Sequence, residues 1–267
     1  METGSRLATC PLCRGQTREI GLVRGPRTGR VLPVVECADC RSLFNPSGYR
    51  EQESDLRADS EYLNRHFERS SSYYLDLIKT IVKLRPGIRE HLDVGCGAAP
   101  MVYAGRRRGL QSEGLDLNPF AIESAVARGL SARCERLMPN QSGKRYDLVT
   151  CDQVLEHIED PRSFLSTLSS HVAESGMVFI NVPYRPPAAL TPFYLRYPRA
   201  WTSPFLDNDV HINHFSHRAM TTVVKELLGM RWLVPFYGAR NNLARLVRWG
   251  LLRVLDVPRG YLYGRSE

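Results

Sequence analysis

The 267-residue sequence lacks any apolar run that approaches the length of a membrane-spanning helix, which excludes helical membrane spans. It also lacks an apolar stretch near its start, because residues 1–6 lead directly into a cysteine-containing segment. We therefore expect no signal peptide and a cytoplasmic location. Internal repeats and low-complexity segments are absent too, which excludes a repeat architecture.

Acidic residues are scarce in the last third of the chain. Residues 185–267 hold twelve Lys or Arg against five Asp or Glu, and so carry nearly all of the formal net charge of +8. A basic region attracts a phosphate-bearing substrate, a nucleic acid or an anionic membrane surface, or it is a solvated face without a partner. We expect a small-molecule substrate rather than a nucleic acid. An anionic substrate and a peripheral membrane contact both stay open, and the sequence indicates no oligomeric state.

Four of the seven cysteines form two Cys-x2-Cys pairs, namely Cys10 with Cys13 and Cys37 with Cys40. Each pair can point two thiolates at one centre, so that two pairs complete a tetrahedral four-sulfur site typical of structural zinc. The segment between the pairs predicts a hairpin over residues 20–35, and hence a zinc ribbon over residues 1–45. Redox motifs and disulfides are the alternatives, but neither pair opens a helix after a strand.

Residues 46–65 are polar and are expected to form a linker, followed by a domain over residues 66–267. Apolar spacing predicts a helix over residues 73–84, after which strand and helix signals alternate. Such alternation predicts an α/β fold: a Rossmann-like, doubly wound, mostly parallel sheet of seven strands. The predicted strands cover residues 91–94, 112–115, 131–134, 146–151, 176–182, 231–237 and 260–263. The predicted helices between and after them cover residues 101–109, 119–128, 161–172, 216–228 and 241–255.

Two regions in the last third are harder to assign. Residues 183–213 hold six prolines and many aromatic residues, and they predict a long loop or lid. The helix expected near residues 240–255 has an apolar stripe flanked by arginines, which favours packing on the core with a solvated basic edge. A membrane-surface helix is the alternative, because Trp249 and the leucines suit an interface.

Glycines and acidic residues follow the first two strands of the predicted domain. Gly95 and Gly97 stand at a strand-to-helix turn, where glycine lets the backbone approach a ligand closely. Position 100 is proline, so the dinucleotide-binding G-x-G-x-x-G pattern fails. Asp116 ends the second strand about 20 residues later, where an acidic side chain can accept both ribose hydroxyls of an adenosine ligand.

These features resemble the class I S-adenosylmethionine-dependent methyltransferases of the small-molecule type. The resemblance covers about residues 62–237, and its motifs are specific as a set. The matching segments are Leu92–Gly97, Leu115–Asp116, Tyr146–Pro161, Asn181–Pro183 and His211–Ser216. An N-terminal four-cysteine ribbon resembles that of methyltransferases in sugar, polysaccharide and natural-product pathways. One departure is Ala99, where the family often has a third glycine, and the cost of alanine there is expected to be small.

The resemblance implies S-adenosylmethionine as the cofactor, beside the structural zinc. It implies that Gly95 and Gly97 face the methionine part, and that Asp116 holds the ribose. The full set of expected cofactor-binding residues is Arg69, Tyr73, Asp93, Gly95, Gly97, Asp116, Leu117, Glu135, Asp152 and Gln153.

Methyl transfer needs a base only if the acceptor keeps its proton, and histidine suits that task near neutral pH. The expected catalytic residues are His157, just past the fourth strand, and His211 and Tyr184 on the loop after the fifth. His157 could instead only orient the next helix, and His214 could lie on a loop surface.

The predicted function is methyl transfer to oxygen or carbon of a small molecule, such as a sugar or a natural-product or lipid-linked intermediate. The first alternative is an RNA methyltransferase that uses the ribbon for RNA binding, although the ribbon is nearly neutral and RNA binding usually needs a basic face. The second is a non-catalytic binding protein, against which the intact cofactor motifs argue.

Overall fold

The computed structural model describes residues 9–25, 29–47, 59–183, 211–230, 232–236 and 260–264. The chain divides into two compact units. The first, here called the ribbon unit, comprises Met1–Arg50, Leu155–Leu165 and Val182–Leu228; the second, the sheet unit, comprises Glu51–Val154, Ser166–Asn181 and Gly229–Glu267. No helix among the described residues is long and apolar enough to cross a membrane.

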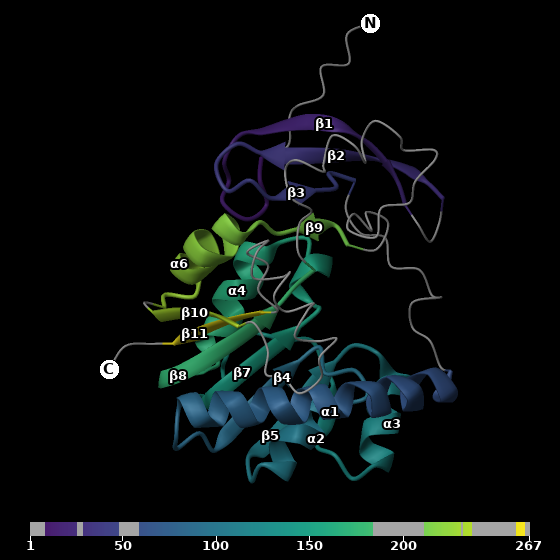
Figure 1. The fold of residues 1–267 in the computed structure, drawn as a ribbon, viewed down its shortest axis with the longest axis vertical. Helices are drawn as coiled ribbons and strands as arrows, with labels where there is room; N and C mark the ends of the chain where they lie inside the picture. Colours follow the sequence, from purple (N-terminus) through teal and green to yellow (C-terminus); the bar gives the residue numbers. More distant parts are fainter. Residues whose placement is uncertain are drawn as a thin grey trace, which may run out of the picture. The chain divides into compact units, whose positions relative to one another are not determined.

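The sheet unit contains a seven-stranded sheet in the order β10-β11-β8-β7-β4-β5-β6 (Figure 1). Strands β4 to β8 pair in parallel, whereas β11 runs antiparallel to both β8 and β10. The predicted fold class and its seven strands are therefore confirmed. The strands span Glu90–Val94 (β4), Gln111–Asp116 (β5), Ala132–Cys134 (β6), Tyr146–Asp152 (β7), Val172–Asn181 (β8), Trp232–Phe236 (β10) and Gly260–Gly264 (β11).

Helices α2 (Pro100–Arg107), α3 (Pro119–Ala127) and α4 (Pro161–Ser170) connect the parallel strands. The Asn118 side chain accepts hydrogen bonds from the first two free amides of α3, and Pro119 occupies its first turn. The Asp160 carboxylate accepts from the Ser163 amide in the same manner, at 3.1 Å. Both helices thus begin at the N-cap and proline pairs on which their prediction rested.

Helix α1 (Ser60–Leu84) is longer than the predicted helix, and it begins inside the segment expected to be a linker. Asp59 caps it by accepting hydrogen bonds from the amides of Glu61 and Tyr62. Its first turns are largely exposed, so the apolar periodicity that indicates a helix starts only further along. In Figure 1, α1, α2 and α3 lie together along one face of the sheet.

The core of the sheet unit joins α1 and α2 to the central strands. Its buried side chains are Leu77, Ile78, Ile81, Ile88, Met101, Ala104, Leu110, Leu148, Met177, Phe179 and Leu262. Burial of each of the larger side chains contributes about 1.5–3 kcal/mol. The core therefore helps to fix β7, whose carboxyl end carries a polar residue described below.

The ribbon unit contains a four-stranded antiparallel sheet in the order β1-β2-β3-β9. Strands β1 (Thr17–Arg24) and β2 (Val31–Cys37) form the predicted hairpin. Two short strands absent from the prediction, β3 (Leu43–Phe44) and β9 (Asn213–His214), extend it. Residues 155–165 and 182–228 thus group with the ribbon rather than with the sheet, a grouping that the sequence did not indicate.

The segment after β9 is helical, as predicted. The Ser216 hydroxyl accepts a hydrogen bond from the Ala219 amide at 2.9 Å. A short π-helix over Ala219–Val224 then continues into α6 (Lys225–Leu227). The predicted helix over residues 241–255 and most of the predicted loop over residues 183–213 lie outside the described residues.

Candidate functional site

The carboxyl ends of β4, β5 and β7 meet at one edge of the sheet, because these strands run parallel and side by side. The amides of Gly95 and Cys96 donate to the Leu115 carbonyl at 2.7 and 3.0 Å, which joins the two predicted motifs directly. The Gly97 amide donates to Asp116 Oδ2 at 2.8 Å, and the Asn118 amide donates to Asp116 Oδ1 at 2.8 Å. The predicted glycine turn and the predicted ribose acid thus form one structure.

The two glycines of this turn are required for different reasons. Both have left-handed backbones, with φ of 76° at Gly95 and 54° at Gly97. A Cβ on Gly95 would lie 2.1 Å from the Val154 side chain, whereas a Cβ on Gly97 would meet no atom within 4 Å. Gly97 therefore borders open space, where a ligand can approach the backbone. Ala99 is also left-handed, at φ 63°, so alanine costs about 1–2 kcal/mol there, more than expected.

Asp93 lies beneath the turn and is 3% exposed. Thr150 donates a hydrogen bond to Asp93 Oδ1 at 2.7 Å. Burial, followed by the nearby charges of Asp152 and Asp116, raises the pKa of Asp93 to about 8, although the Thr150 hydrogen bond acts in the opposite direction. Three carboxyl groups therefore share this edge of the sheet, and their mutual repulsion favours a cationic ligand.

Asp152 is held in place from two sides. Tyr74 donates to Asp152 Oδ2 at 2.5 Å, and the Asn181 amide group donates to Oδ1 at 2.6 Å. Burial raises the pKa of Asp152, and these two hydrogen bonds partly oppose that rise. Neither Tyr74 nor Asn181 was among the predicted site residues. Tyr73, which was, places its ring 5.2 Å from that of Tyr74, and Arg69 is exposed on α1.

The remaining predicted cofactor residues flank this edge. Leu117 follows β5 and is exposed. Glu135 follows β6, where its amide donates to the Asp116 carbonyl at 3.1 Å and its carboxylate pairs with Arg133. Gln153 follows β7 with a left-handed backbone, and its amide donates to the Asn181 carbonyl at 2.9 Å.

A group of histidines lies in the ribbon unit. His157 ends the short 3-10 turn Leu155–His157, and its ring centroid lies 4.9 Å from that of His211. Two predicted catalytic residues, far apart in sequence, thus lie side by side. His214, in β9, is 1% exposed rather than on a loop surface, and neither of its ring nitrogens has a hydrogen-bond partner among the described residues. Tyr184, the third predicted catalytic residue, lies outside the described residues.

Glu156 belongs to the same group and was not among the predicted site residues. Its side chain is fully buried. One carboxylate oxygen of Glu156 and one ring nitrogen each of His157 and His211 lie within 4.8 Å of one another. Its position beside His157 in the Leu155–His157 turn was the one available signal, because burial of a carboxylate leaves no trace in the sequence pattern.

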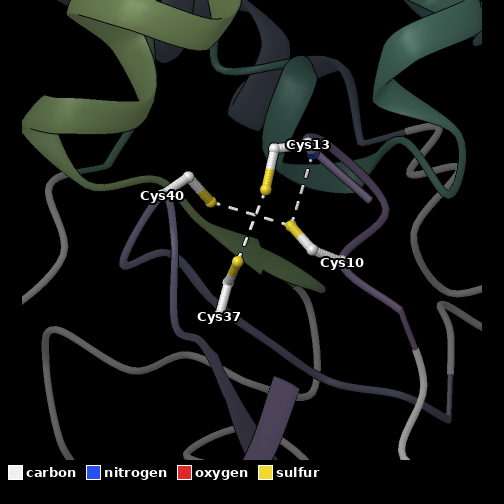
Figure 2. A group of neighbouring side chains, drawn as sticks. All are labelled: Cys10, Cys13, Cys37 and Cys40. Atoms are coloured by element: carbon white, nitrogen blue, oxygen red, sulfur yellow. Dashed lines mark hydrogen bonds between the residues drawn. The ribbon is translucent and has the colours of Figure 1, made fainter. Parts of the chain in front are cut away.

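The four cysteines of the ribbon converge, as Figure 2 shows. Their sulfur atoms all lie within 4.8 Å of one another, with 3.7 Å between Cys10 and Cys40 and 3.4 Å between Cys13 and Cys37. All four are free thiols, so the disulfide alternative is wrong for this structure. A tetrahedral zinc ion with Zn–S bonds of about 2.3 Å separates its sulfur ligands by about 3.8 Å, so the cluster fits zinc.

The ribbon also holds the segment that carries His211. Strand β9 pairs with β3, and the Asn45 amide donates to the Ile212 carbonyl at 2.8 Å. Ser216 donates to the Cys40 carbonyl at 2.5 Å, and Asn213 donates to the Ile158 carbonyl at 2.7 Å. The cysteine cluster and the histidine group therefore belong to one hydrogen-bonded framework.

A family model described as a methyltransferase domain matches residues 64–227, which is more than half of the chain. The chain belongs to this methyltransferase family. The resemblance to class I S-adenosylmethionine-dependent methyltransferases is thereby confirmed at the level of the family. The four cysteines lie outside the matched residues.

Curated relatives match part of the methyltransferase domain. The ubiquinone biosynthesis O-methyltransferase of Aeromonas salmonicida (strain A449) is 32% identical over 106 residues, which are 37% of this chain and 44% of that protein. The protein of the same name from Xanthomonas campestris pv. campestris (strain B100) is 34% identical over 124 residues, covering 43% and 51%. The chain thus spans about half the length of the curated relatives it matches.

Solved structures extend the similarity of the fold. The plantazolicin methyltransferase BpumL in complex with SAH superposes with a TM-score of 0.56 at 16% identity, covering 81% of this chain and 92% of that one. An S-adenosylmethionine-dependent methyltransferase from Mesorhizobium loti gives 0.50 at 18% identity, covering 70% and 95%. At these identities, the comparison establishes a shared fold.

Proposed function

We propose that the protein transfers a methyl group from S-adenosylmethionine to an oxygen or carbon atom of a small-molecule acceptor. The observation that carries this proposal is the hydrogen bond from the Gly97 amide to the Asp116 carboxylate. It joins the open glycine turn to a carboxylate that can accept the ribose hydroxyls. Each Asp116 oxygen accepts one backbone amide and keeps lone pairs free for a ligand hydroxyl. The residues present therefore fit an adenosine-containing ligand.

The acidic edge of the sheet fits the charge of this cofactor. The negative charges of Asp152 and Asp116 oppose ionisation of Asp93 and so contribute to its raised pKa. When bound, the cofactor supplies an electrophilic methyl group on a positively charged sulfur. A cation near these carboxylates offsets their repulsion. We assign the methionine part to the glycine turn and Asp152, and the ribose to Asp116, with Leu117, Glu135, Gln153, Tyr73 and Arg69 as flanking positions.

Positioning is the main contribution that the chain makes to the reaction. Holding two reactants in line supplies roughly 7–11 kcal/mol in well-oriented reactions. Asp152 is suited to this role because Tyr74 and Asn181 fix both of its oxygens. His157 and His211 are assigned to the removal of the acceptor's proton, directly or through a group that they hold.

The acceptor is assigned from the curated relatives. The curated relatives are named as O-methyltransferases of ubiquinone biosynthesis, which supports an oxygen acceptor on a small molecule. A sugar, a natural product or a lipid-linked intermediate all fit that description. We further propose that the four cysteines bind a structural zinc ion, because a closed set of four thiolates leaves no open position for chemistry.

Replacing Asp116 with alanine tests the proposal. Two hydrogen bonds to a charged group contribute about 1.5–3 kcal/mol each, so we expect the D116A variant to bind S-adenosylhomocysteine at least about tenfold more weakly by calorimetry. Glu123→Ala is the matched control, because it removes an exposed carboxylate from the neighbouring helix α3. We expect the affinity of that control to be unchanged.

Three outcomes would count against the proposal. If the wild-type protein bound neither S-adenosylmethionine nor S-adenosylhomocysteine, the result would favour the alternative of a non-catalytic binding protein. Equal loss of affinity in the D116A and E123A variants would show a general effect of charge rather than a ribose contact. Nucleic acid that copurifies and is lost with salt would favour the RNA alternative.

A further inference from the structure

Glu156, His157 and His211 bring two imidazoles and one carboxylate to a single point in the ribbon unit. The three ligand atoms lie within 4.8 Å of one another, and Glu156 is fully buried while both histidines are half-buried. Atoms bound at about 2.1 Å to one ion lie at most about 4.2 Å apart. Small side-chain movements would therefore bring all three into one coordination sphere.

Burial strengthens the case that this group binds a cation. Glu156 is 0% exposed, and the two imidazoles beside it are suitable co-ligands for a cation. His214 lies beside His211, with ring centroids 6.2 Å apart, and both of its buried nitrogens lack a hydrogen-bond partner among the described residues. A water molecule held by an ion is one partner that would satisfy a buried imidazole of this kind.

The donor set differs from that of the four cysteines in a way that predicts a different role. Four thiolates form a closed tetrahedral site, whereas two imidazoles and one carboxylate leave at least one coordination position open. Imidazole and carboxylate donors suit first-row transition metals such as zinc, iron and nickel. Three protein ligands with an open position are typical of catalytic metal sites.

We propose that Glu156, His157 and His211 bind a divalent first-row transition-metal ion at a second metal site, at which at least one coordination position stays open. Binding of this ion stands independently of the proposed function.

Cobalt binding to the full chain tests the site, because Co²⁺ distinguishes thiolate from imidazole ligands by its absorption spectrum. We expect demetallated wild-type protein to bind two equivalents of Co²⁺. One equivalent should show intense sulfur-to-cobalt charge transfer, and the other should show only weak visible bands. The His211→Gln variant should lose the second equivalent, with at least about 100-fold weaker binding, and should retain the first.

Matched controls assign each equivalent to its site. His171→Gln alters a histidine whose Nε2 bonds to the Met138 carbonyl in the sheet unit, and it should bind both equivalents. The Cys37→Ser variant should bind the thiolate-ligated equivalent of Co²⁺ more weakly and should bind the second equivalent as the wild-type protein does. Circular dichroism of each variant checks that it is folded.

Three results would overturn the site. The first is that the wild-type protein binds only one equivalent of Co²⁺. The second is that the second equivalent of Co²⁺ still binds unchanged in both the H157Q and H211Q variants. The third is that X-ray absorption of the wild-type protein loaded with two equivalents shows only sulfur around cobalt. The last measurement needs no variant. Binding of S-adenosylhomocysteine by the same preparations shows separately whether the proposed function holds, because no ligand of the second site is assigned to the cofactor.

Discussion

At the scale of single residues, Asp93 is a residue whose burial lowers the stability of the folded protein. The pKa of this carboxyl is raised from 3.8 to about 8 by burial and by neighbouring carboxylates. Below about pH 4, both folded and unfolded chains are protonated there. Between about pH 4 and pH 8 the unfolded chain ionises while the folded one does not, so the free energy of unfolding falls as pH rises.

The Asp93→Asn substitution should therefore stabilise the cofactor-free protein. Asparagine keeps the oxygen that accepts from Thr150 and cannot ionise. We expect a gain of about 1–3 kcal/mol at pH 8 and a smaller gain at pH 5, measured by urea unfolding. E123Q, at an exposed position, should show no such pH dependence. A gain that is equal at both pH values would mean that Asp93 is ionised in the folded protein.

The sequence could identify some site residues and not others for physical reasons. Gly97 and Asp116 follow adjacent parallel strands, so their meeting was predictable once the strands were assigned. Tyr74 was not predictable, because successive helical residues point about 100° apart and the pattern does not say which tyrosine faces the sheet. Glu156 was missed because a fully buried carboxylate is rare, and no periodicity reveals it.

At the scale of elements, the strands and helices with strong end signals were predicted well, and the two-residue strands were not. Helices α3 and α4 begin at the expected N-cap and proline pairs. Strands β3 and β9 have two residues each, which is too short for any alternation to be visible. Their pairing joins segments that are far apart in the chain, so it depends on the tertiary fold rather than on local propensity.

Ser216 gives a direct test of this pairing. Its hydroxyl donates to the Cys40 carbonyl and accepts from the Ala219 amide, and its residue is buried. We expect the Ser216→Ala variant to lose about 1–2 kcal/mol of stability, because it removes a helix cap and leaves a buried carbonyl without this donor. The Ser163→Ala variant makes the same change at an exposed position of α4 and should be near neutral. Equal stability of the two variants would show that the Cys40 contact contributes nothing.

At the scale of the whole molecule, the expected division into residues 1–45, 46–65 and 66–267 remains a prediction about which parts fold independently. The structure groups residues 155–165 and 182–228 with the ribbon. The sequence could not indicate this grouping, because the family motifs run continuously along the chain across it. Residues 184–210, which we propose to choose the acceptor, lie outside the described residues.

Removal of the proposed zinc ion from the four cysteines tests whether the ribbon unit depends on it. The buried cluster of Val23, Val34 and Leu43 is small, whereas the core that joins α1 and α2 to β7, β8 and β11 is extensive. A segment of this size seldom folds without a metal or another staple. We expect chelation of the full chain to increase hydrogen exchange in β1, β2, β3 and β9, and to leave β4, β5 and β7 protected.

Hydrogen-exchange mass spectrometry with and without a zinc chelator makes this measurement, and β9 is its decisive peptide. Strand β9 lies far along the chain from the cysteines but pairs with β3, which follows Cys40 closely. If the ribbon is a separate module, chelation should expose β1 and β2 and leave β9 unchanged. If the framework is continuous, β9 and the His211 segment should lose protection together with β2. The Cys37→Ser variant removes only the cysteine site and leaves the ligands of the proposed second site in place. If β9 also loses protection in this variant without chelator, the loss is due to the cysteine site.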